Sequence, residues 1–232
     1  VAGMANKVLA GIADRIFTAF PNALPKAAWV GNPLRPAFLQ QPEPAARFAG
    51  RTGPLKLLVV GGSLGAQALN SVVPQALALM PEPQRPVVTH QSGEKQIDAL
   101  RANYIAAGIQ AELTPFIDDT AQAFAEADLI VCRSGASTVT EIAAVGAAAL
   151  FVPFPAAVDD HQTTNARFLV DAGAAWLVPQ KELSPQQLAL RLQSLQREQL
   201  VAMAEKAKQL QKTEAVAAVV SACEQLAKVP NT

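Results

Sequence analysis

From Gly53 onward, short apolar runs rich in Val, Leu and Ile alternate with longer stretches whose apolar positions recur every three or four residues. The short runs predict strands, and the longer stretches predict amphipathic helices. This alternation is typical of a doubly wound parallel α/β sheet, a Rossmann-like architecture with helices on both faces. We expect strands near 55–60, 86–90, 111–114, 128–132, 148–152 and 174–178, and helices at about 65–79, 94–107, 119–126, 137–146 and 160–172.

The first 53 residues do not continue this alternation. Residues 6–19 have a helical or mixed pattern, and residues 27–30 predict a short strand followed by a turn. Residues 39–53 are rich in Pro, Ala and Gly, a composition that predicts a linker. We therefore expect 1–38 to be the tail of a preceding domain, and the start at Val1, inside an apparent helix, suggests a chain cut from something longer.

The C-terminal part of the chain is predominantly helical in pattern. Ser184 and Pro185 predict a helix start, because Ser is a favoured N-cap and Pro a favoured first helical residue. Helical periodicity then continues to about Lys228 with few breaks. The predicted organisation is a tail at 1–38, a linker at 39–53 and a ligand-binding domain with C-terminal helices at 54–232.

Composition excludes several classes of protein. Half of the 232 residues are hydrophobic, and 19 basic residues balance 19 acidic ones, which argues against a nucleic-acid binder that depends on a strong positive field. The longest apolar run, 142–155, is interrupted by Gly and Pro and is shorter than the roughly 20 residues of a membrane-spanning helix. No signal peptide is evident. Cys132 and Cys223 form no C-x-x-C pair, so we expect a reducing compartment.

The segment from Ala127 to Glu141 predicts an anion site. An apolar strand is followed there by a turn of small residues and then by a helix. Such a turn leaves free backbone N–H groups at the helix N-terminus, where an anion can bind. Ser137, Thr138 and Thr140 add hydroxyl donors. Glu141 lies about one turn further along, where its carboxylate can accept hydrogen bonds from ribose hydroxyls.

A second loop of the same kind, Gly61 to Ala66, joins the strand predicted at 55–60 to the next helix. It matches neither the Walker A pattern nor G-x-G-x-x-G. Taken alone, glycines at such a turn are more often simple turn chemistry. The two loops together favour a diphosphate ligand.

Six segments of the chain carry motifs in a recognisable order and spacing. They are Gly31-Asn32-Pro33-Leu34-Arg35, Gly61 to Ala66, His90-Gln91-Ser92-Gly93, Phe116-Ile117-Asp118-Asp119, Cys132 to Glu141, and Asp159 to Ala166. Through them nearly the whole chain resembles the MurG family, the transferases that add N-acetylglucosamine to lipid I, giving lipid II, in peptidoglycan synthesis. The resemblance implies a GT-B glycosyltransferase fold, of which this chain would be the C-terminal, donor-binding domain with a remnant of the N-terminal one.

The resemblance also implies which residues bind the donor, UDP-N-acetylglucosamine. The expected contacts are Arg35 and Ser63 at the diphosphate or sugar, Ile117 at the uracil through its backbone, Ala136, Ser137, Thr138, Val139 and Thr140 at the phosphates, Glu141 at the ribose, and Gln162 at the sugar hydroxyls. Many relatives have His where this chain has Ala156, which puts a role for that position in doubt.

The implied reaction is attack of the C4 hydroxyl of lipid I on the anomeric carbon, with inversion and loss of UDP. No Asp-x-Asp metal motif is present, so we expect no metal and no cofactor, with helix N-termini and Arg35 stabilising the leaving group. The family's glycine-rich motif, whose His is the proposed base, would precede Val1. We therefore expect no catalytic residue in this chain, and donor binding with hardly any turnover.

The implied partners are UDP-N-acetylglucosamine, lipid I through the missing domain, and the cytoplasmic face of the inner membrane, where the full-length protein would be peripheral. The fragment itself is expected to be soluble, with no nucleic-acid partner. Two other functions stay open at this point. One is another GT-B enzyme, such as a UDP-N-acetylglucosamine 2-epimerase, and the other is a non-catalytic nucleotide-sugar-binding module.

Several of these residues also have plainer explanations. Asp118-Asp119 and Asp159-Asp160 precede predicted helices and fit helix caps better than metal ligands. The two histidines, His90 and His161, have no evident triad partner, so we expect neither to be catalytic. Arg35 fits an ordinary surface arginine, and Glu141 and Gln162 fit plain helix residues.

Overall fold

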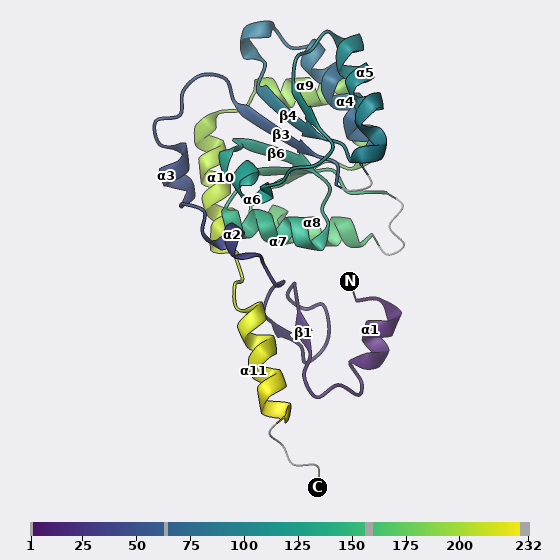
Figure 1. Ribbon diagram of the computed structural model, residues 1–232, viewed down its shortest axis with the longest axis vertical. Helices are drawn as coiled ribbons and strands as arrows, with labels where there is room; N and C mark the ends of the chain where they lie inside the picture. Colours follow the sequence, from purple (N-terminus) through teal and green to yellow (C-terminus); the bar gives the residue numbers. More distant parts are fainter. Residues whose placement is uncertain (1, 63–64, 156–159, 228–232) are drawn as a thin grey trace.

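The centre of the molecule is a six-stranded sheet in which every strand pair is parallel (Figure 1). The computed structural model describes residues 2–62, 65–155 and 160–227. The strands are β3 (Lys56–Val60), β4 (Val87–Gln91), β5 (Glu112–Thr114), β6 (Leu129–Cys132), β7 (Ala149–Phe151) and β8 (Trp176–Leu177). Their order across the sheet is β5-β4-β3-β6-β7-β8, so the strand order reverses between β3 and β6. This confirms the predicted doubly wound architecture.

Helices cover both faces of the sheet because successive strand side chains point to opposite sides. Leu57 and Val59 belong to the hydrophobic core under α4 (Gln67–Ala78), α5 (Ile97–Ala107) and α9 (Pro185–Gln193). Leu58 and Ile130 belong to the core under α6 (Thr120–Glu126), α7 (Ala136–Val145) and α8 (His161–Val170). The last helix of the domain, α10 (Arg197–Gln209), contributes side chains to both cores.

The N-terminal part of the chain lies below the sheet domain in Figure 1. Its elements are α1 (Met4–Leu9), β1 (Phe17–Thr18) and β2 (Ala28–Trp29), with β1 and β2 paired in parallel. The next helix, α2 (Pro36–Leu39), packs on the sheet domain beside α6 and α7, where Phe38 is fully buried. Aromatic rings attach it to α8, since Phe20 and Trp29 pack edge-on against Phe168 with ring centroids 5.4 and 5.7 Å apart. The ammonium of Lys212 lies 4.7 Å from the centroid of the Trp29 ring.

The predicted strands and helices of the sheet domain are all present, with shifts of a few residues at their ends. Short 3₁₀ helices at Glu82–Gln84, Glu94–Gln96 and Gln180–Glu182 complete the connections. The continuous helical pattern after Ser184 is instead three helices, α9, α10 and α11 (Ala215–Ala227). Ser184 caps α9 as predicted, because its hydroxyl accepts a hydrogen bond from the backbone N–H of Gln187 at 3.3 Å.

The segment predicted as a linker packs against the sheet domain. Within it, α3 (Pro44–Phe48) forms a short helix whose Phe48 is buried in the core. The guanidinium of Arg47 donates hydrogen bonds to the carbonyls of Ala125 at 2.7 Å and Val145 at 2.9 Å, and also to that of Gly146. Proline, alanine and glycine content predicted a linker here, and one buried aromatic ring and one multiply bonded arginine hold this segment against the sheet domain. The domain boundaries themselves stay a prediction.

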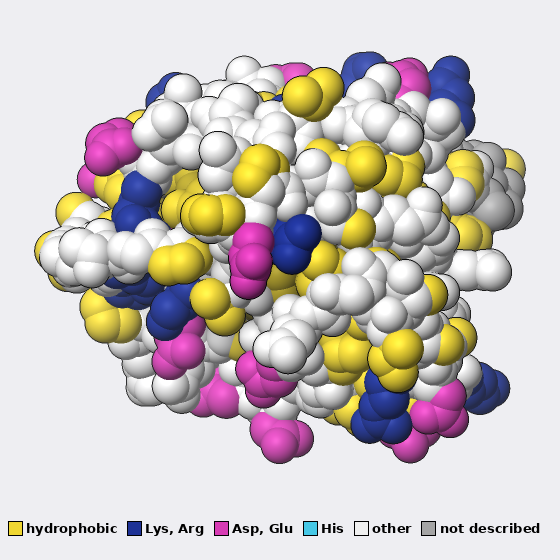
Figure 2. All heavy atoms as spheres, turned by 90° about the horizontal axis from the view of Figure 1, so that it is seen from above, with side chains coloured by type: hydrophobic (Ala, Val, Ile, Leu, Met, Phe, Trp, Pro, Cys, Tyr) yellow, Lys and Arg dark blue, Asp and Glu magenta, His cyan; other side chains and the backbone are white. Residues whose placement is uncertain are grey.

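Charge is interspersed on the surface seen from the sheet end of the molecule. In Figure 2, Lys and Arg side chains alternate with Asp and Glu side chains across this face, with apolar atoms between them. This distribution agrees with the balance of 19 basic and 19 acidic residues.

One carboxylate joins three parts of the fold at the amino ends of the central strands. Asp128 is 1% exposed and accepts hydrogen bonds from the backbone N–H of Lys56 at 2.9 Å, from Arg51 at 2.7 Å and from Arg197 at 3.1 Å. Burial alone would raise the pKa of Asp128, but these donors outweigh it and hold the pKa below its usual value. The linker segment, the sheet and α10 are thus fastened to one another through a single ionised group.

We expect Asp128→Asn to lower the free energy of unfolding by about 3 kcal/mol, because it leaves two partly buried guanidinium groups without their counter-charge. Urea denaturation followed by circular dichroism at neutral pH measures this loss. The matched control is Asp98→Asn, since Asp98 is an exposed carboxylate whose pair with Arg101 lies on a helix surface. Equal stability of the two variants would contradict the assigned role of Asp128.

Candidate functional site

The two loops that the sequence predicts as an anion site, after β3 and after β6, lie side by side at one edge of the sheet. Val60, the last residue of β3, pairs with Cys132, the last residue of β6. The connections that follow, beginning at Gly61 and Arg133, therefore leave neighbouring strands at the carboxyl edge of the sheet. This is the strand-order reversal, where open α/β sheets bind their ligands.

The N-terminus of α7 presents unpaired amides. Gly135 is the N-cap and provides no side-chain cap. Val139 donates its backbone N–H to the Gly135 carbonyl at 3.0 Å, so the free N–H groups are those of Ala136, Ser137 and Thr138, which have no acceptor among the described residues. Three parallel amides at the positive end of a ten-residue helix form a site suited to a phosphate.

The predicted phosphate segment divides into two parts with different environments. Ser137 is exposed and Thr138 is half-buried. The Val139 side chain is fully buried in the core. Thr140 directs its hydroxyl to the helix itself, within 3.1 Å of the Ala136 carbonyl and 2.9 Å of the Ser137 carbonyl. The structure thus turns Ala136, Ser137 and Thr138 outward, whereas Val139 and Thr140 stabilise the helix.

The turn at 31–36 reaches the same helix from the N-terminal part of the chain. Asn32 donates its side-chain N–H to the Thr140 hydroxyl at 3.2 Å. Gly31 has φ +88°, and a Cβ there would lie 2.7 Å from the Cβ of Lys212, so both conformation and space require glycine. The turn places the exposed Arg35 beside α7, with its guanidinium 5.0 Å from the centroid of the Phe38 ring.

Glu141 lies one helical turn beyond the free amides and is half-buried. Burial raises the pKa of its carboxyl, and the positive charge of Arg35 partly offsets this effect. Arg35 therefore lies close enough to Glu141 for its charge to act on that carboxyl, and the shared ligand site remains a prediction. In its carboxylate form the group can accept hydrogen bonds from two neighbouring hydroxyls.

The glycine loop after β3 has a defined backbone on both sides of Ser63, which itself lies outside the described residues. Gly61 donates its N–H to the Gln91 carbonyl at 2.9 Å. Gly62 and Gly65 have φ +78° and +75°, and a Cβ at Gly65 would lie 2.6 Å from the Gln96 side chain. The left-handed backbone favours glycine at both positions, and at Gly65 the lack of space also requires it.

The connection after β5 carries Ile117, the residue expected at the uracil. Ile117 is half-buried, its carbonyl accepts a hydrogen bond from the Thr120 hydroxyl at 3.4 Å, and its N–H has no acceptor among the described residues. Asp119 caps α6 by accepting from the Gln122 backbone N–H at 2.9 Å, which confirms the predicted capping role. The cap fixes where the helix begins and hence where Ile117 lies.

Gln162 holds the connection between β7 and α8. Its side-chain oxygen accepts a hydrogen bond from the Phe154 backbone N–H at 2.9 Å. Its side-chain N–H groups make no hydrogen bond to the described residues, so they can donate to a ligand. Asp160 occupies the N-cap position of α8 at φ +47° without a side-chain cap bond, contrary to the predicted capping, because caps usually require extended backbone. Asp159 and Ala156 lie outside the described residues.

His90 has a structural role. It is fully buried, with one ring nitrogen 3.0 Å from the Tyr104 hydroxyl and the other 3.1 Å from the side-chain oxygen of Asn70. Burial lowers the pKa of His90 to about 3, so the ring is neutral at physiological pH. His161 is exposed at the first position of α8.

Several residues that support the site were not singled out from the sequence. Arg133 donates to the carbonyls of Val152 at 2.9 Å and Pro153 at 3.1 Å, and to the Gln180 side chain at 2.7 Å. The only local signal for Arg133 was its position directly after a strand.

Lys208 donates to the Ala144 carbonyl at 2.7 Å. With Arg47 it places two cations at the negative end of α7.

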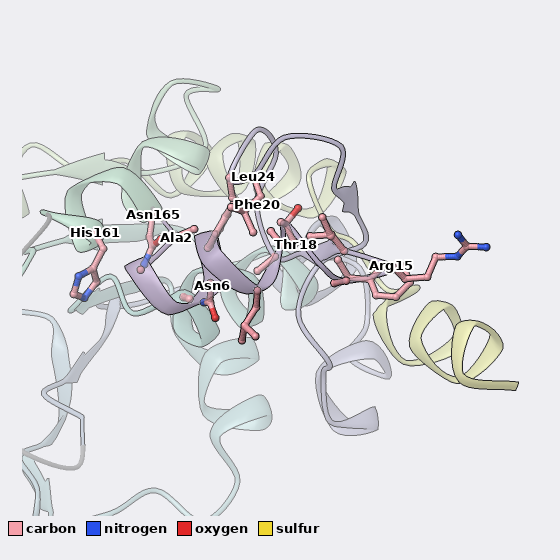
Figure 3. Close-up of a pocket in the computed structure, with 17 residues that line it drawn as sticks. Ala2, Asn6, Arg15, Thr18, Phe20, Leu24, His161 and Asn165 are labelled. Atoms are coloured by element: carbon pink, nitrogen blue, oxygen red, sulfur yellow. The ribbon is translucent and has the colours of Figure 1, made fainter. Parts of the chain in front are cut away.

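A cavity of about 650 Å³ separates the N-terminal part from the ends of α7 and α8. Ala136, His161 and Asn165 line it on one side, and Asn6 and Thr18 on the other. In Figure 3, His161 and Asn165 lie together at one end, and Arg15 extends away at the other. The cavity therefore opens next to the free amides of α7.

The comparisons with known proteins agree with this geometry. Residues 56–220 match the model of the glycosyltransferase family 28 C-terminal domain. A Polaromonas sp. protein named UDP-N-acetylglucosamine--N-acetylmuramyl-(pentapeptide) pyrophosphoryl-undecaprenol N-acetylglucosamine transferase is 73% identical over 98% of this chain. A Paracidovorax citrulli protein of the same name is 73% identical over 97% of it. The chain spans 59% and 64% of these two relatives.

Solved structures give the same result. The crystal structure of Acinetobacter baumannii MurG is 41% identical, with a TM-score of 0.87, and the match covers 97% of this chain and 64% of that one. Anabaena HepE, solved with UDP and glucose, shares the fold at 15% identity and a TM-score of 0.60, over 88% of this chain and 57% of that one. These findings confirm the resemblance to MurG and the GT-B fold class. The chain belongs to the glycosyltransferase family 28 C-terminal domain family.

Proposed function

We propose that this chain is the donor-binding part of an enzyme that transfers N-acetylglucosamine from UDP-N-acetylglucosamine to lipid I. The observation that carries the proposal is the row of amides at Ala136, Ser137 and Thr138, which have no acceptor in the described part of the chain, with Glu141 one turn further along α7. Amides at a helix N-terminus fit a phosphate, and a carboxylate one turn away fits the ribose attached to it.

The other proposed donor contacts are those that the family resemblance implies. Ile117 would offer backbone groups to the uracil, and Ser63, which lies outside the described residues, would contact the diphosphate or the sugar. Arg35, beside Glu141, supplies a cation for the phosphates. Gln162, whose side-chain N–H groups bond none of the described residues, would donate to the sugar hydroxyls. Val139 and Thr140 contribute by holding the helix start in place, since the side chain of one is in the core and the hydroxyl of the other bonds the helix.

The chemistry that this arrangement supports is departure of UDP from the anomeric carbon. As the bond breaks, negative charge grows on the diphosphate, and fixed N–H dipoles with a nearby guanidinium stabilise it without reorganising. A hydroxyl of the acceptor attacks from the opposite side, giving inversion. The base that removes its proton would come from the part of the protein that this chain does not span.

The acceptor and the location are inferred from the relatives' printed names, which specify a pyrophosphoryl-undecaprenol acceptor. An acceptor with a polyprenyl chain resides in a membrane, so we propose that the whole protein works as a peripheral enzyme at the cytoplasmic face of the inner membrane. No helix in the described part of the chain is long and apolar enough to cross a membrane.

We expect Glu141→Gln to weaken UDP binding by about tenfold, because a charged acceptor of hydroxyl hydrogen bonds is replaced by a neutral one. Isothermal titration calorimetry of this chain with UDP measures the change. With 2′,3′-dideoxy-UDP, the variant and the unmodified chain should bind alike, since the hydroxyls are gone.

The matched control is Glu205→Gln, an exposed helix carboxylate of α10 remote from the site. If Glu141→Gln lost as much affinity for 2′,3′-dideoxy-UDP as for UDP, recognition of the ribose hydroxyls by Glu141 would be contradicted. Absence of UDP binding by the unmodified chain would contradict the donor site itself.

We also expect UDP affinity to decrease with falling pH through Glu141. Because burial raises the pKa of Glu141, its carboxylate becomes protonated at a higher pH than an ordinary glutamate and then accepts hydrogen bonds less well. Calorimetry with UDP from about pH 8 to about pH 5 tests this expectation. UDP itself also titrates in this range, and the Glu141→Gln variant corrects for that effect. The variant should lack the part of the pH dependence that comes from Glu141. Parallel pH profiles of UDP affinity for the unmodified chain and Glu141→Gln would contradict a contribution from Glu141.

Transfer is tested in a chimera in which this chain replaces the matching part of the Polaromonas relative. We expect the chimera to transfer N-acetylglucosamine to a lipid I analogue, with release of UDP, because the two sequences are 73% identical over that part. A chimera that binds UDP-N-acetylglucosamine but transfers nothing, while the unmodified relative is active, would favour a non-catalytic binding module.

A further inference from the structure

Gln91 is a buried glutamine whose side chain is fully used in hydrogen bonds. It is the last residue of β4 and is 4% exposed. Its Oε1 accepts from the Gly62 backbone N–H at 3.0 Å. Its Nε2 donates to the Gly62 carbonyl at 3.1 Å and to the Pro115 carbonyl at 2.8 Å. One side chain therefore bonds both polar groups of Gly62 and a second loop as well.

These partners belong to the two loops that we assign to different parts of one ligand. Gly62, at φ +78°, lies in the glycine loop after β3, and Pro115 lies two residues before Ile117. The main chain next to Gln91 joins the same loops, since its carbonyl accepts from Gly61 N–H at 2.9 Å and Gly93 donates to the Pro115 carbonyl at 3.1 Å. The distance between the loops is thus set through the end of β4.

A glutamine is required at this position for a chemical reason. The partners comprise one N–H group and two carbonyl oxygens, so the side chain must both accept and donate. A carboxylate of the same shape would face two carbonyl oxygens without a proton to donate, and burial makes such a mismatch costly. A protonated carboxyl would restore one of the lost donors.

We propose that Gln91 is a positioning residue for nucleoside diphosphate binding, which holds the diphosphate loop and the base loop at the separation that one ligand spans. The inference rests on the proposed function of the site. A ligand that bridges the loops depends on their separation, whereas a ligand that uses only the base and ribose contacts does not. Loss of Gln91 should therefore weaken UDP binding far more than uridine binding.

The test compares Gln91→Glu with the unmodified chain, using UDP in calorimetry and uridine in ligand-observed NMR. At about pH 8 we expect Q91E to lose at least about tenfold in UDP affinity and less than about threefold in uridine affinity. Near pH 5.5 we expect the UDP affinity of Q91E to return to within about threefold of the unmodified chain at the same pH, because burial raises the pKa of the introduced carboxyl.

Two further variants keep the test independent of folding. Gln91→Met has a similar volume but no hydrogen-bonding groups, so it should lose UDP affinity at every pH without recovery. Gln75→Glu makes the same chemical change at an exposed position of α4 and should change nothing.

Equal losses for UDP and uridine, or no recovery of Q91E at low pH, would overturn the positioning role. Unchanged UDP affinity in both Gln91 variants would also overturn it while leaving the proposed function intact. If the unmodified chain bound no UDP, the proposed function and this inference would both be wrong.

Discussion

The structure depends above all on the parallel pairing of β3 with β6. Their register runs from Leu57 opposite Leu129 to Val60 opposite Cys132. Because parallel strands end at the same edge, the loops that follow them are neighbours although they are about seventy residues apart in the chain. The strand order reverses at this pair, so the helices that follow the two strands, α4 and α7, cover opposite faces of the sheet. The glycine loop and the N-terminus of α7 can therefore face one ligand.

Charged side chains from outside the sheet hold this pair and its helix in position. At the amino ends of the strands, Asp128 joins Arg51 and Arg197. At the far end of α7, Arg47 and Lys208 bond the last carbonyls. Protein cations thus offset the negative end of the helix, whereas the amides at its positive end have no acceptor among the residues that the structure describes. This asymmetry is what a phosphate site at the N-terminus requires.

The N-terminal part of the chain contributes to the same site. Asn32 bonds Thr140 at 3.2 Å, and the charge of Arg35 acts on Glu141. The contacts of Phe20 and Trp29 with Phe168 hold this part against α8. The start of α7 is therefore bordered by a segment that precedes the sheet, and the cavity beside Ala136 opens between the two.

The sequence by itself determined the features that depend on local chemistry. Hydrophobic periodicity predicted the strands and helices, Asp119 and Ser184 were predicted as caps, and both loops were located by their small residues. Only the tertiary structure decided which groups meet. In the described part of the chain, α3 packs against the core, Gln91 bonds both loops, and three amides of α7 have no acceptor while Val139 is buried. The reason is distance along the chain, since the partners of Asn32, Arg47 and Lys208 lie 108, 98 and 64 residues away and no local pattern encodes them.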